Sequence, residues 1–308
     1  MNNVLSTRVT IFRNLKDYKF EPKLMPEKKQ EIVDKLSLAL KGKMSLLTLN
    51  QADVKVVSFL KSNDLVLGAT QNLFVSKNKN LAINLFCGEH ISIVSTCEGF
   101  KDEVINNACE ISQSLNNKIN FAFSDEFGYL MSDLNKIGSG IKIESNIMLS
   151  AIKTINKIEQ LQQNISKLGY TLKETKYPAV YTLSTRCNLG IGEKKLFEDF
   201  KNTLSKIQDL EIESVKMLDV TNHDELLDKV NRSVAIINSA HLLSYDELYN
   251  LIVNIRMGVN AGLIDFKVET INRLQKLISG KQNDLVSQSE LKALAEKTKE
   301  ILKGEENV

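Results

Sequence analysis

The sequence has no tryptophan, only three prolines, and no Gly/Ser-rich or Pro-rich tract. Its composition therefore excludes the usual forms of flexible linker and low-complexity tail. No apolar run reaches the roughly 18 residues that a membrane-spanning helix requires. Residues 1–14 alternate polar and apolar side chains and lack the apolar stretch of a signal peptide, so we expect a cytoplasmic protein.

Cysteine and histidine are also scarce, with four and three copies respectively. The cysteines form no CxxC pair, and no spacing of cysteines and histidines is typical of a structural zinc site. We therefore predict no metal centre, and we expect reduced, unreactive thiols at Cys87, Cys97, Cys109 and Cys187.

The rest of the composition is that of an ordinary globular protein. Of the 308 residues, 43% are hydrophobic and 25% are charged, and this length favours two domains over one. The net charge of +2 excludes both the basic stripe of a nucleic-acid-binding protein and a polybasic membrane surface.

Hydrophobic periodicity divides the chain into a mixed part and a helical part. In the first part it predicts helices at residues 27–41, 103–115, 145–168 and 193–210, and strands at 81–85, 91–93, 119–123, 170–172 and 180–184. After about residue 215 only helices are expected, at residues 225–237, 245–259, 268–278 and 289–302. We therefore predict an α+β domain over residues 1–213, with an antiparallel sheet flanked by helices, and an all-helical domain over residues 214–308.

Four stretches also carry a family resemblance, in a consistent order along the chain. They are STRVTIFRNL at residues 6–15, DEFGYL at 125–130 followed by IGSG at 137–140, LGYTL at 168–172 followed by the segment 183–190, and residues 245–265, which include NIRMGV and GLI. Together they resemble the ATP:guanidino phosphotransferase (phosphagen kinase) family. The last stretch is similar to the bacterial protein arginine kinases in particular.

This resemblance implies a guanidino kinase catalytic domain with a glutamine-synthetase-like sheet, a helical dimerisation or partner domain, and ATP with Mg²⁺ as cofactors. It implies transfer of a phosphoryl group to an arginine guanidinium. Such transfer needs cations around the phosphates and a carboxylate near the attacking nitrogen. In the family, arginines form the phosphate clamp, because their planar fork binds phosphate oxygens in pairs.

Several family positions carry other residues in this sequence. Arg8 keeps the first arginine of the opening motif, but the second falls at Thr10. The family's N-E-E-D-H motif falls on residues 86–90, which places the catalytic glutamate position at Gly88, and the next clamp arginine falls at Ser92.

Further along the chain the departures continue. The family's loop cysteine falls at Asp133, and two later arginines fall at Lys142 and Lys173. The loop after Lys173 is shortened to residues 174–178, and the phosphoarginine-binding R-D-x-x-R-A stretch, expected near residues 289–295, has lost its arginines. The remaining candidates for phosphate or nucleotide contact are Arg8, Arg13, Lys142 and Lys173.

The candidates for displaced acid–base chemistry are Glu89, His90 and Asp133. The competing interpretation places Glu89 in solvent at a turn and gives His90 only local hydrogen bonds. Arg8 and Lys142 can equally be ion-paired or solvated, and Lys173 can belong to a charged hairpin. A new thiol or metal site that includes Cys87 has no supporting ligand spacing.

The lost groups favour a catalytically impaired protein. A positioned acid–base group typically contributes on the order of 10²–10⁴ in rate, and a charge-stabilising arginine about 10³–10⁵. The leading hypothesis is therefore a regulatory or scaffold subunit in a Clp/heat-shock quality-control system. Its expected state is a homodimer, or a heteromer with a paralogous arginine kinase or its zinc-containing activator, with a Clp ATPase or heat-shock repressor as further candidate partners. The alternatives are an active kinase with a rearranged site and a nucleotide or phosphoarginine sensor.

Overall fold

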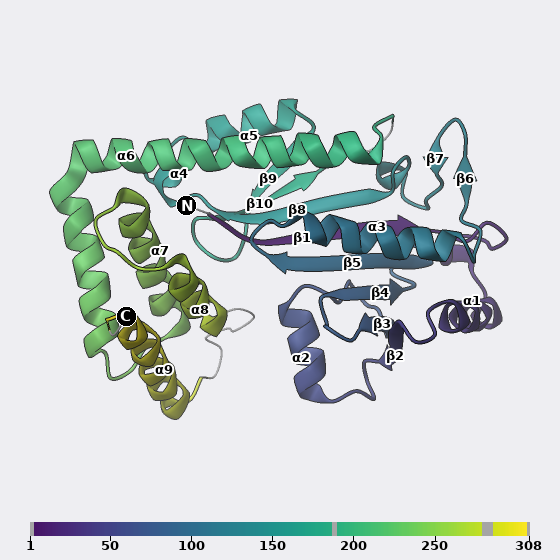
Figure 1. Ribbon diagram of the computed structural model, residues 1–308, viewed down its shortest axis with the longest axis horizontal. Helices are drawn as coiled ribbons and strands as arrows, with labels where there is room; N and C mark the ends of the chain where they lie inside the picture. The colour runs from purple at the N-terminus through teal and green to yellow at the C-terminus, as the bar shows by residue number, and fades with distance from the viewer. Residues whose placement is uncertain (1–2, 187–189, 279–285, 307–308) are drawn as a thin grey trace.

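A mixed sheet-and-helix part and a helical part make up the computed structural model, which describes residues 3–186, 190–278 and 286–306. The first part is built on an eight-stranded sheet with the order β2-β3-β4-β5-β1-β8-β10-β9, in which every paired strand is antiparallel (Figure 1). The expected α+β class with an antiparallel sheet is thereby confirmed. The strands are β1 (Val4–Arg13), β2 (Met44–Thr48), β3 (Asn72–Ser76), β4 (Leu81–Leu85), β5 (Ile91–Glu98), β8 (Ile141–Met148), β9 (Tyr170–Glu174) and β10 (Val180–Thr185), and a separate hairpin joins β6 (Phe123–Ser124) to β7 (Gly128–Tyr129).

The two faces of the sheet differ because side chains alternate along each strand. One face packs its apolar residues, among them Val9, Ile11 and Ile143, against helices in the main core. The helices on this face are α3 (Asp102–Asn116), α5 (Ile158–Lys167) and the first half of α6 (Glu193–Ser239). On the opposite face, α2 (Val54–Ser62) covers only the part near β3, β4 and β5, where Leu60 joins a small separate core.

Helix α1 (Pro26–Ala39) confirms the helix expected at residues 27–41. Two short 3-10 helices, η1 (Glu21–Lys23) and η2 (Leu134–Lys136), lie in the connections. The expected strands around residues 81–85, 91–93, 170–172 and 180–184 are confirmed as β4, β5, β9 and β10.

Two elements of the first part differ from the sequence-based expectation. The helix expected at residues 145–168 is wrong at its start, because β8 occupies residues 141–148 and leaves α4 (Ser150–Thr154) and α5 as separate helices. Alternating burial along β8, with Ile141, Ile143 and Ile147 facing the core, is the strand signal there. The strand expected at 119–123 is also wrong, since only a single bridge from Phe121 to Leu15 and the short strand β6 form.

Helix α6 is longer than the expected helix at residues 193–210. It continues to Ser239, with a kink at Asn222 where φ is −139° and ψ is 41°. No proline or glycine occurs between residues 193 and 239 to end the helix. Figure 1 shows the helix running along the sheet and then turning to border the C-terminal helices. The expected domain boundary at residues 213/214 therefore lies inside one helix.

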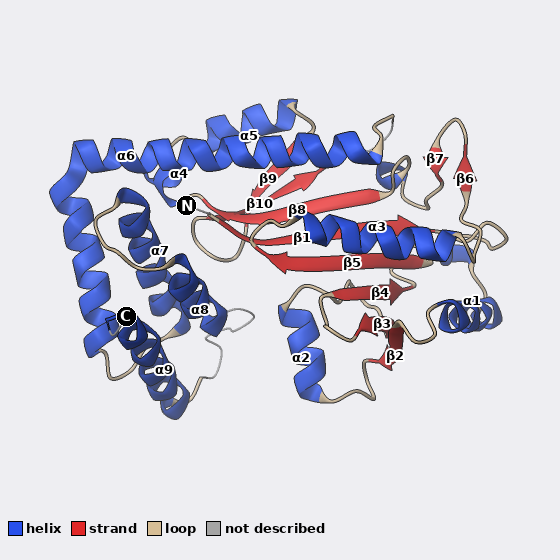
Figure 2. Ribbon diagram, viewed as in Figure 1, coloured by secondary structure: helices blue, strands red, loops and turns tan. Residues whose placement is uncertain are grey.

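The C-terminal part consists of the second arm of α6 with three further helices (Figure 2). These are α7 (Tyr245–Ala261), α8 (Val268–Ile278) and α9 (Gln288–Glu306), which confirm the expected helices. Their shared core also takes in Met148 and Val180 from the ends of β8 and β10. Within the described residues, no helix combines the length and apolar character needed to cross a membrane.

A buried carboxylate connects the long helix to the end of the sheet. The side chain of Glu211 on α6 is fully buried and accepts hydrogen bonds from the backbone N–H groups of Ala151 (2.8 Å) and Ile152 (3.0 Å). The hydroxyl of Ser150 donates a third bond of 3.2 Å. Burial raises the pKa of Glu211 despite these bonds. Glu211 therefore satisfies the first turn of α4, which follows directly after β8.

We expect Glu211→Ala to lower the free energy of unfolding by about 3 kcal/mol, since each buried donor left unsatisfied costs roughly 1–3 kcal/mol. Urea titration followed by circular dichroism measures the change. The matched control is Glu213→Ala, which removes an exposed carboxylate from the same helix. Equal stability of the two variants would contradict a structural role for the Glu211 carboxylate.

Candidate functional site

The candidate site lies on the uncovered polar face of the sheet, where β1, β8, β10 and β9 present small polar and charged side chains. The strand register pairs Arg8 with Glu144 and Thr10 with Lys142, and Ser184 on β10 also pairs with Glu144. Because these residues share one alternation phase, their side chains lie on the same face. The first clamp position, Arg8, is thus placed beside a later one, Lys142.

Glu144 holds both of these cations. Nε of Arg8 donates to Oε2 of Glu144 at 3.0 Å and its Nη2 makes a second, closer contact, while Nζ of Lys142 lies 2.7 Å from Oε1. Although burial pushes the pKa of Glu144 upward, Arg8 and Lys142 together hold that pKa below its ordinary value. A second carboxyl group, that of Asp64, lies within electrostatic reach of Arg8 and Glu144, and burial raises its pKa. The two cations therefore share their surroundings with two carboxyl groups. The sequence left ion-paired and solvated roles possible for Arg8 and Lys142, and in the structure both side chains are ion-paired.

Lys173 and Arg13 do not join this cluster. Lys173 lies exposed on β9, which β10 separates from β8. Arg13 belongs to the other alternation phase of β1, and its side chain is buried on the helix-covered side, 1% exposed. Arg13 was expected at the phosphates together with Arg8, and the structure corrects that grouping, because residues five apart on a strand face opposite sides of the sheet.

The Arg13 guanidinium is engaged in protein contacts. Nη1 donates to the backbone oxygens of Phe12 (2.8 Å) and Ser139 (2.9 Å), and Nη2 lies 3.2 Å from a carboxylate oxygen of Glu193. Its central carbon lies 3.4 Å from the ring centroid of Tyr129. These contacts tie β1 to β7, to the loop before β8 and to the start of α6.

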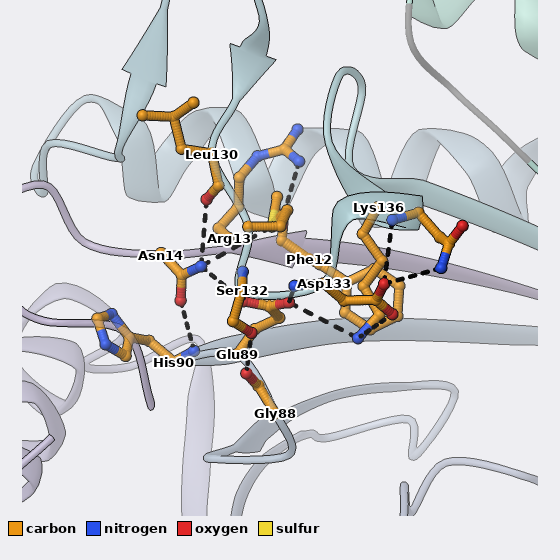
Figure 3. A network of polar contacts seen from close by, with 12 residues as sticks. Phe12, Arg13, Asn14, Gly88, Glu89, His90, Leu130, Ser132, Asp133 and Lys136 are labelled. Atoms are coloured by element: carbon orange, nitrogen blue, oxygen red, sulfur yellow. Dashed lines mark hydrogen bonds and ion pairs between the residues drawn. The ribbon is translucent and has the colours of Figure 1, made fainter. Parts of the chain in front are cut away.

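Glu89 is the centre of a buried polar network (Figure 3). Its side chain is 0% exposed, so the expectation that it faces solvent is wrong. It accepts hydrogen bonds from Nδ2 of Asn14 (2.6 Å) and from the backbone N–H groups of Ser132 (3.0 Å) and Asp133 (3.4 Å). The carboxylate thereby joins the β4–β5 connection to the end of β1 and to the loop after β7.

His90 is held by the backbone on both sides of its ring. Nδ1 accepts the N–H of Leu15 at 3.0 Å, so the proton is assigned to Nε2, which lies 2.8 Å from the carbonyl oxygen of Lys19. The backbone N–H of His90 donates to Oδ1 of Asn14 at 2.9 Å. Burial lowers the pKa of His90. His90 thus makes hydrogen bonds that hold the fold together, but the expectation that they are local is wrong, because the partners are more than seventy residues away in the chain.

Asp133 and an unforeseen lysine complete the network. Asp133 caps η2 by accepting the N–H of Asn135 at 3.0 Å, and this bond is the main cause of a lowered pKa of Asp133. Nζ of Lys136 lies 3.6 Å from Oε1 of Glu89 and 3.6 Å from Oδ2 of Asp133. The only sequence signal for this arrangement was the separation of three residues between Asp133 and Lys136.

Gly88, at the position that the resemblance assigns to the catalytic glutamate, faces this lysine. A Cβ atom built on Gly88 would lie 3.9 Å from Nζ of Lys136. The backbone of Gly88 has φ +85°, and Phe86 has φ +56°, so the β4–β5 connection uses two left-handed positions. A glutamate at residue 88 would be strained in this conformation.

The shortened loop at residues 174–178 packs against the helical part instead of the polar face. The ring of Tyr177 stacks on Tyr249 of α7, with centroids 5.3 Å apart. The hydroxyl of Tyr249 donates to the carbonyl oxygen of Pro178 at 2.6 Å. This loop therefore contributes to the contact between the sheet and α7.

The residues present fit ATP and Mg²⁺ poorly. Glu144 pairs with both cations of the cluster and Asp64 lies nearby, so little positive charge is left for a polyphosphate. The described part of the chain has no group of three or more His, Cys, Asp or Glu placed to hold a metal ion. Burial raises the pKa of Cys87, Cys97 and Cys109, the last to about 11, which is consistent with unreactive thiols. Cys187 lies outside the described residues.

We expect protonation of His90 to destabilise the fold. Its folded-state pKa is lowered, so its contribution is complete above the unfolded-state pKa of about 6.5 and is lost as pH falls through the folded-state pKa. Urea unfolding at about pH 7 and about pH 5 should show this loss in the wild type and a smaller one in His90→Asn, whose amide oxygen replaces Nδ1 as acceptor. His241→Gln, at an exposed histidine, should retain the full loss. Identical pH dependence in all three proteins would contradict the assignment.

Solved structures share this fold. The substrate-free duplicated taurocyamine kinase from Schistosoma mansoni superposes with a TM-score of 0.62 at 18% identity, covering 80% of this chain and 39% of that chain. A lombricine kinase superposes with a TM-score of 0.60 at 15% identity, covering 68% of this chain and 66% of that chain. At these identities the likeness shows the fold, a sheet flanked by helices as in the phosphagen kinases.

Sequence comparison covers nearly the whole chain. The family model described as "ATP:guanido phosphotransferase, C-terminal catalytic domain" matches residues 1–214, and that described as "Protein-arginine kinase McsB C-terminal domain" matches residues 223–305. The protein-arginine kinase of Halothermothrix orenii is 25% identical over 293 residues, covering 89% of this chain and 84% of the relative. That of Listeria welshimeri is 26% identical over 275 residues, covering 85% and 80%. The chain therefore belongs to the ATP:guanido phosphotransferase family, on the branch of the bacterial protein-arginine kinases.

Proposed function

We propose that this chain is a family member with impaired phosphoryl transfer that acts by binding, as a regulatory or scaffold subunit in a Clp/heat-shock quality-control system. The observation that carries the proposal is the pairing of Gly88 with Lys136. Where the family resemblance calls for a carboxylate that orients and deprotonates a guanidinium, this chain has a hydrogen atom and a neighbouring ammonium group. An ammonium repels a guanidinium and has no lone pair with which to accept its proton.

The neighbouring polar groups do not supply a substitute base. Glu89 is buried and accepts hydrogen bonds from Asn14 and the 131–136 loop, so removing it from these bonds would leave buried donors unsatisfied. Both ring nitrogens of His90 are bonded to backbone groups. Neither side chain is free to approach an acceptor nitrogen without breaking the network that holds the sheet edge and loop together.

The phosphate side of the site supports the same proposal. Arg8 and Lys142 share one carboxylate, and two further clamp positions are the neutral, buried Thr10 and Ser92. An arginine that stabilises charge in phosphoryl transfer is worth about 10³–10⁵ in rate. These losses do not multiply simply, but a single loss of about 10³ would reduce a kinase turnover of about 1–100 per second to about 0.1 per second or less.

A second candidate function, a nucleotide or phosphoarginine sensor, is favoured by one feature. Arg8 and Lys142 remain side by side on the uncovered face of the sheet, with side chains 27% and 44% exposed. An anion could compete with Glu144 for these two cations and bind without being transferred. Such a sensor would use the phosphate side of the site alone.

Apolar side chains exposed on α6 support the proposed binding role. Leu210, Met217 and Val220 are 45%, 50% and 86% exposed, and Met217 and Val220 lie in the last turns before the kink of that helix. We propose a homodimer or a heteromer with a paralogous arginine kinase or its activator, in the cytoplasm, with a Clp ATPase or heat-shock repressor as further partners.

We expect the purified protein to transfer no phosphate from ATP to arginine in the presence of Mg²⁺ and an unstructured protein substrate. Phosphoarginine formation, detected by mass spectrometry under conditions that preserve the P–N bond, is the measurement, with an active protein-arginine kinase as the positive control. Phosphoarginine that disappears in Arg8→Ala would establish the alternative of an active enzyme with a rearranged site.

Titration with ATP and ADP separates the two remaining functions. A ligand that binds only the native state raises the melting temperature. A saturable rise without transfer, abolished by Arg8→Ala, identifies a nucleotide sensor, whereas an unchanged melting temperature leaves the binding role without nucleotide.

We expect the protein to form a defined assembly in its own cells. Affinity purification with mass spectrometry should recover an arginine kinase, its activator, a Clp ATPase or a heat-shock repressor, and Val220→Ser with Met217→Ser should weaken the recovery. A wild-type protein that is monomeric and recovers none of these proteins would overturn the scaffold role.

A further inference from the structure

Lys136 lies where three separate segments of the chain meet. Phe12 belongs to β1, Gly88 and Glu89 to the β4–β5 connection, and Lys136 to η2 (Figure 3). The ammonium group lies 4.6 Å from the centroid of the Phe12 ring, within the roughly 6 Å range of a cation–π contact. The lysine side chain is 26% exposed, so it is largely enclosed by these groups.

The charges around Lys136 form a site for one cation. The carboxylate of Glu89 is fully buried, and that of Asp133 is 43% exposed. Among the ion pairs of the described residues, only those with Lys136 involve Glu89 or Asp133. The hydrogen bonds that Glu89 accepts come from neutral donors, so the positive charge beside this buried carboxylate comes from Lys136.

The ammonium group occupies this site without fitting it closely. Nζ of Lys136 lies 3.6 Å from the nearest oxygen of each carboxylate, whereas a charge-assisted N–H···O hydrogen bond is typically about 2.7–2.9 Å long. Lys136 therefore offsets part of the negative charge of Glu89 and Asp133 without bonding strongly to either. A planar guanidinium is wider and carries donors on several sides, so it can reach two carboxylates at once.

We propose that Lys136 is a resident occupant of a cation site formed by Glu89, Asp133 and the Phe12 ring, and that it keeps this site closed to guanidinium groups from outside. The inference rests on the proposed function in one respect, that Gly88 marks the acceptor side of the site. Lys136 thereby blocks the site with a side chain of the protein itself, and its contact with Glu89 links η2 to the β4–β5 connection.

Vacating the site tests the proposal. In Lys136→Ala, we expect methylguanidinium to bind saturably with a dissociation constant on the order of 1 mM, detected by saturation-transfer NMR on its methyl group. Wild-type protein should give no saturable signal, and methylammonium should bind Lys136→Ala more weakly. The matched control is Lys28→Ala, which removes another lysine paired with a carboxylate three residues away, on an exposed helix surface.

Two further variants define the site. Lys136→Ala combined with Asp133→Asn should lose methylguanidinium binding, because one of the two carboxylates becomes neutral. Lys136→Arg carries the guanidinium within the chain, so its melting temperature should equal or exceed that of the wild type. This second variant keeps the proposal testable if Lys136→Ala does not fold.

No saturable binding to folded Lys136→Ala, equal binding to Lys28→Ala, or a lower melting temperature of Lys136→Arg would each overturn the proposal. These outcomes are independent of the phosphoryl-transfer assay. Phosphoarginine formation by the wild type would overturn the proposed function. The cation site is tested separately, by methylguanidinium binding and by the melting temperature of Lys136→Arg.

Discussion

Side-chain alternation along the central strand β1 determines which residues enter the core and which lie at the candidate site. β1 pairs with β5 on one side and β8 on the other, so each of its residues must face either the helix-covered core or the open polar face. Val9 and Ile11 supply the main core, while Arg8 and Thr10 point to the opposite face, where Arg8 is part-exposed and Thr10 is buried. The same alternation sends Arg13 to the covered side, where it joins β1 to α6 through Glu193. A shift of one residue would exchange all these roles.

The open face keeps the architecture of a guanido phosphotransferase while its charges serve the protein itself. Glu144 binds the two cations that remain near the phosphate side, and Glu89 binds the backbone of the loop after β7. Fully bonded polar networks of this kind make a fold rigid, because each buried group depends on its partners. A side chain that left this network to take part in a reaction would leave its partners without hydrogen bonds. The bonds made by Glu89 and His90 therefore stabilise the fold and hold both side chains away from a reaction.

The family and fold class were accessible from the sequence because they depend on short-range patterns. Glycine-containing motifs such as those at residues 137–140 and 168–172 keep their order, and alternating or helical apolar spacing predicted most strands and helices. The strand β8 was missed, since its residues from 145 onward were assigned to a helix that begins only with α4. The length of α6 was missed because the loss of strand signals was taken as a break between helices.

Sequence alone determined which charges are absent, since Gly88, Thr10 and Ser92 can be identified from motif positions without coordinates. Tertiary structure decided what the remaining charges do. Arg8 and Lys142 are 134 residues apart and meet at Glu144 only because β1 and β8 are neighbours in the sheet. Lys136 reaches Glu89 only because the loop after β7 folds onto the β4–β5 connection. Ion pairs depend on distance in space, and a linear pattern gives that distance only within a single helix or strand.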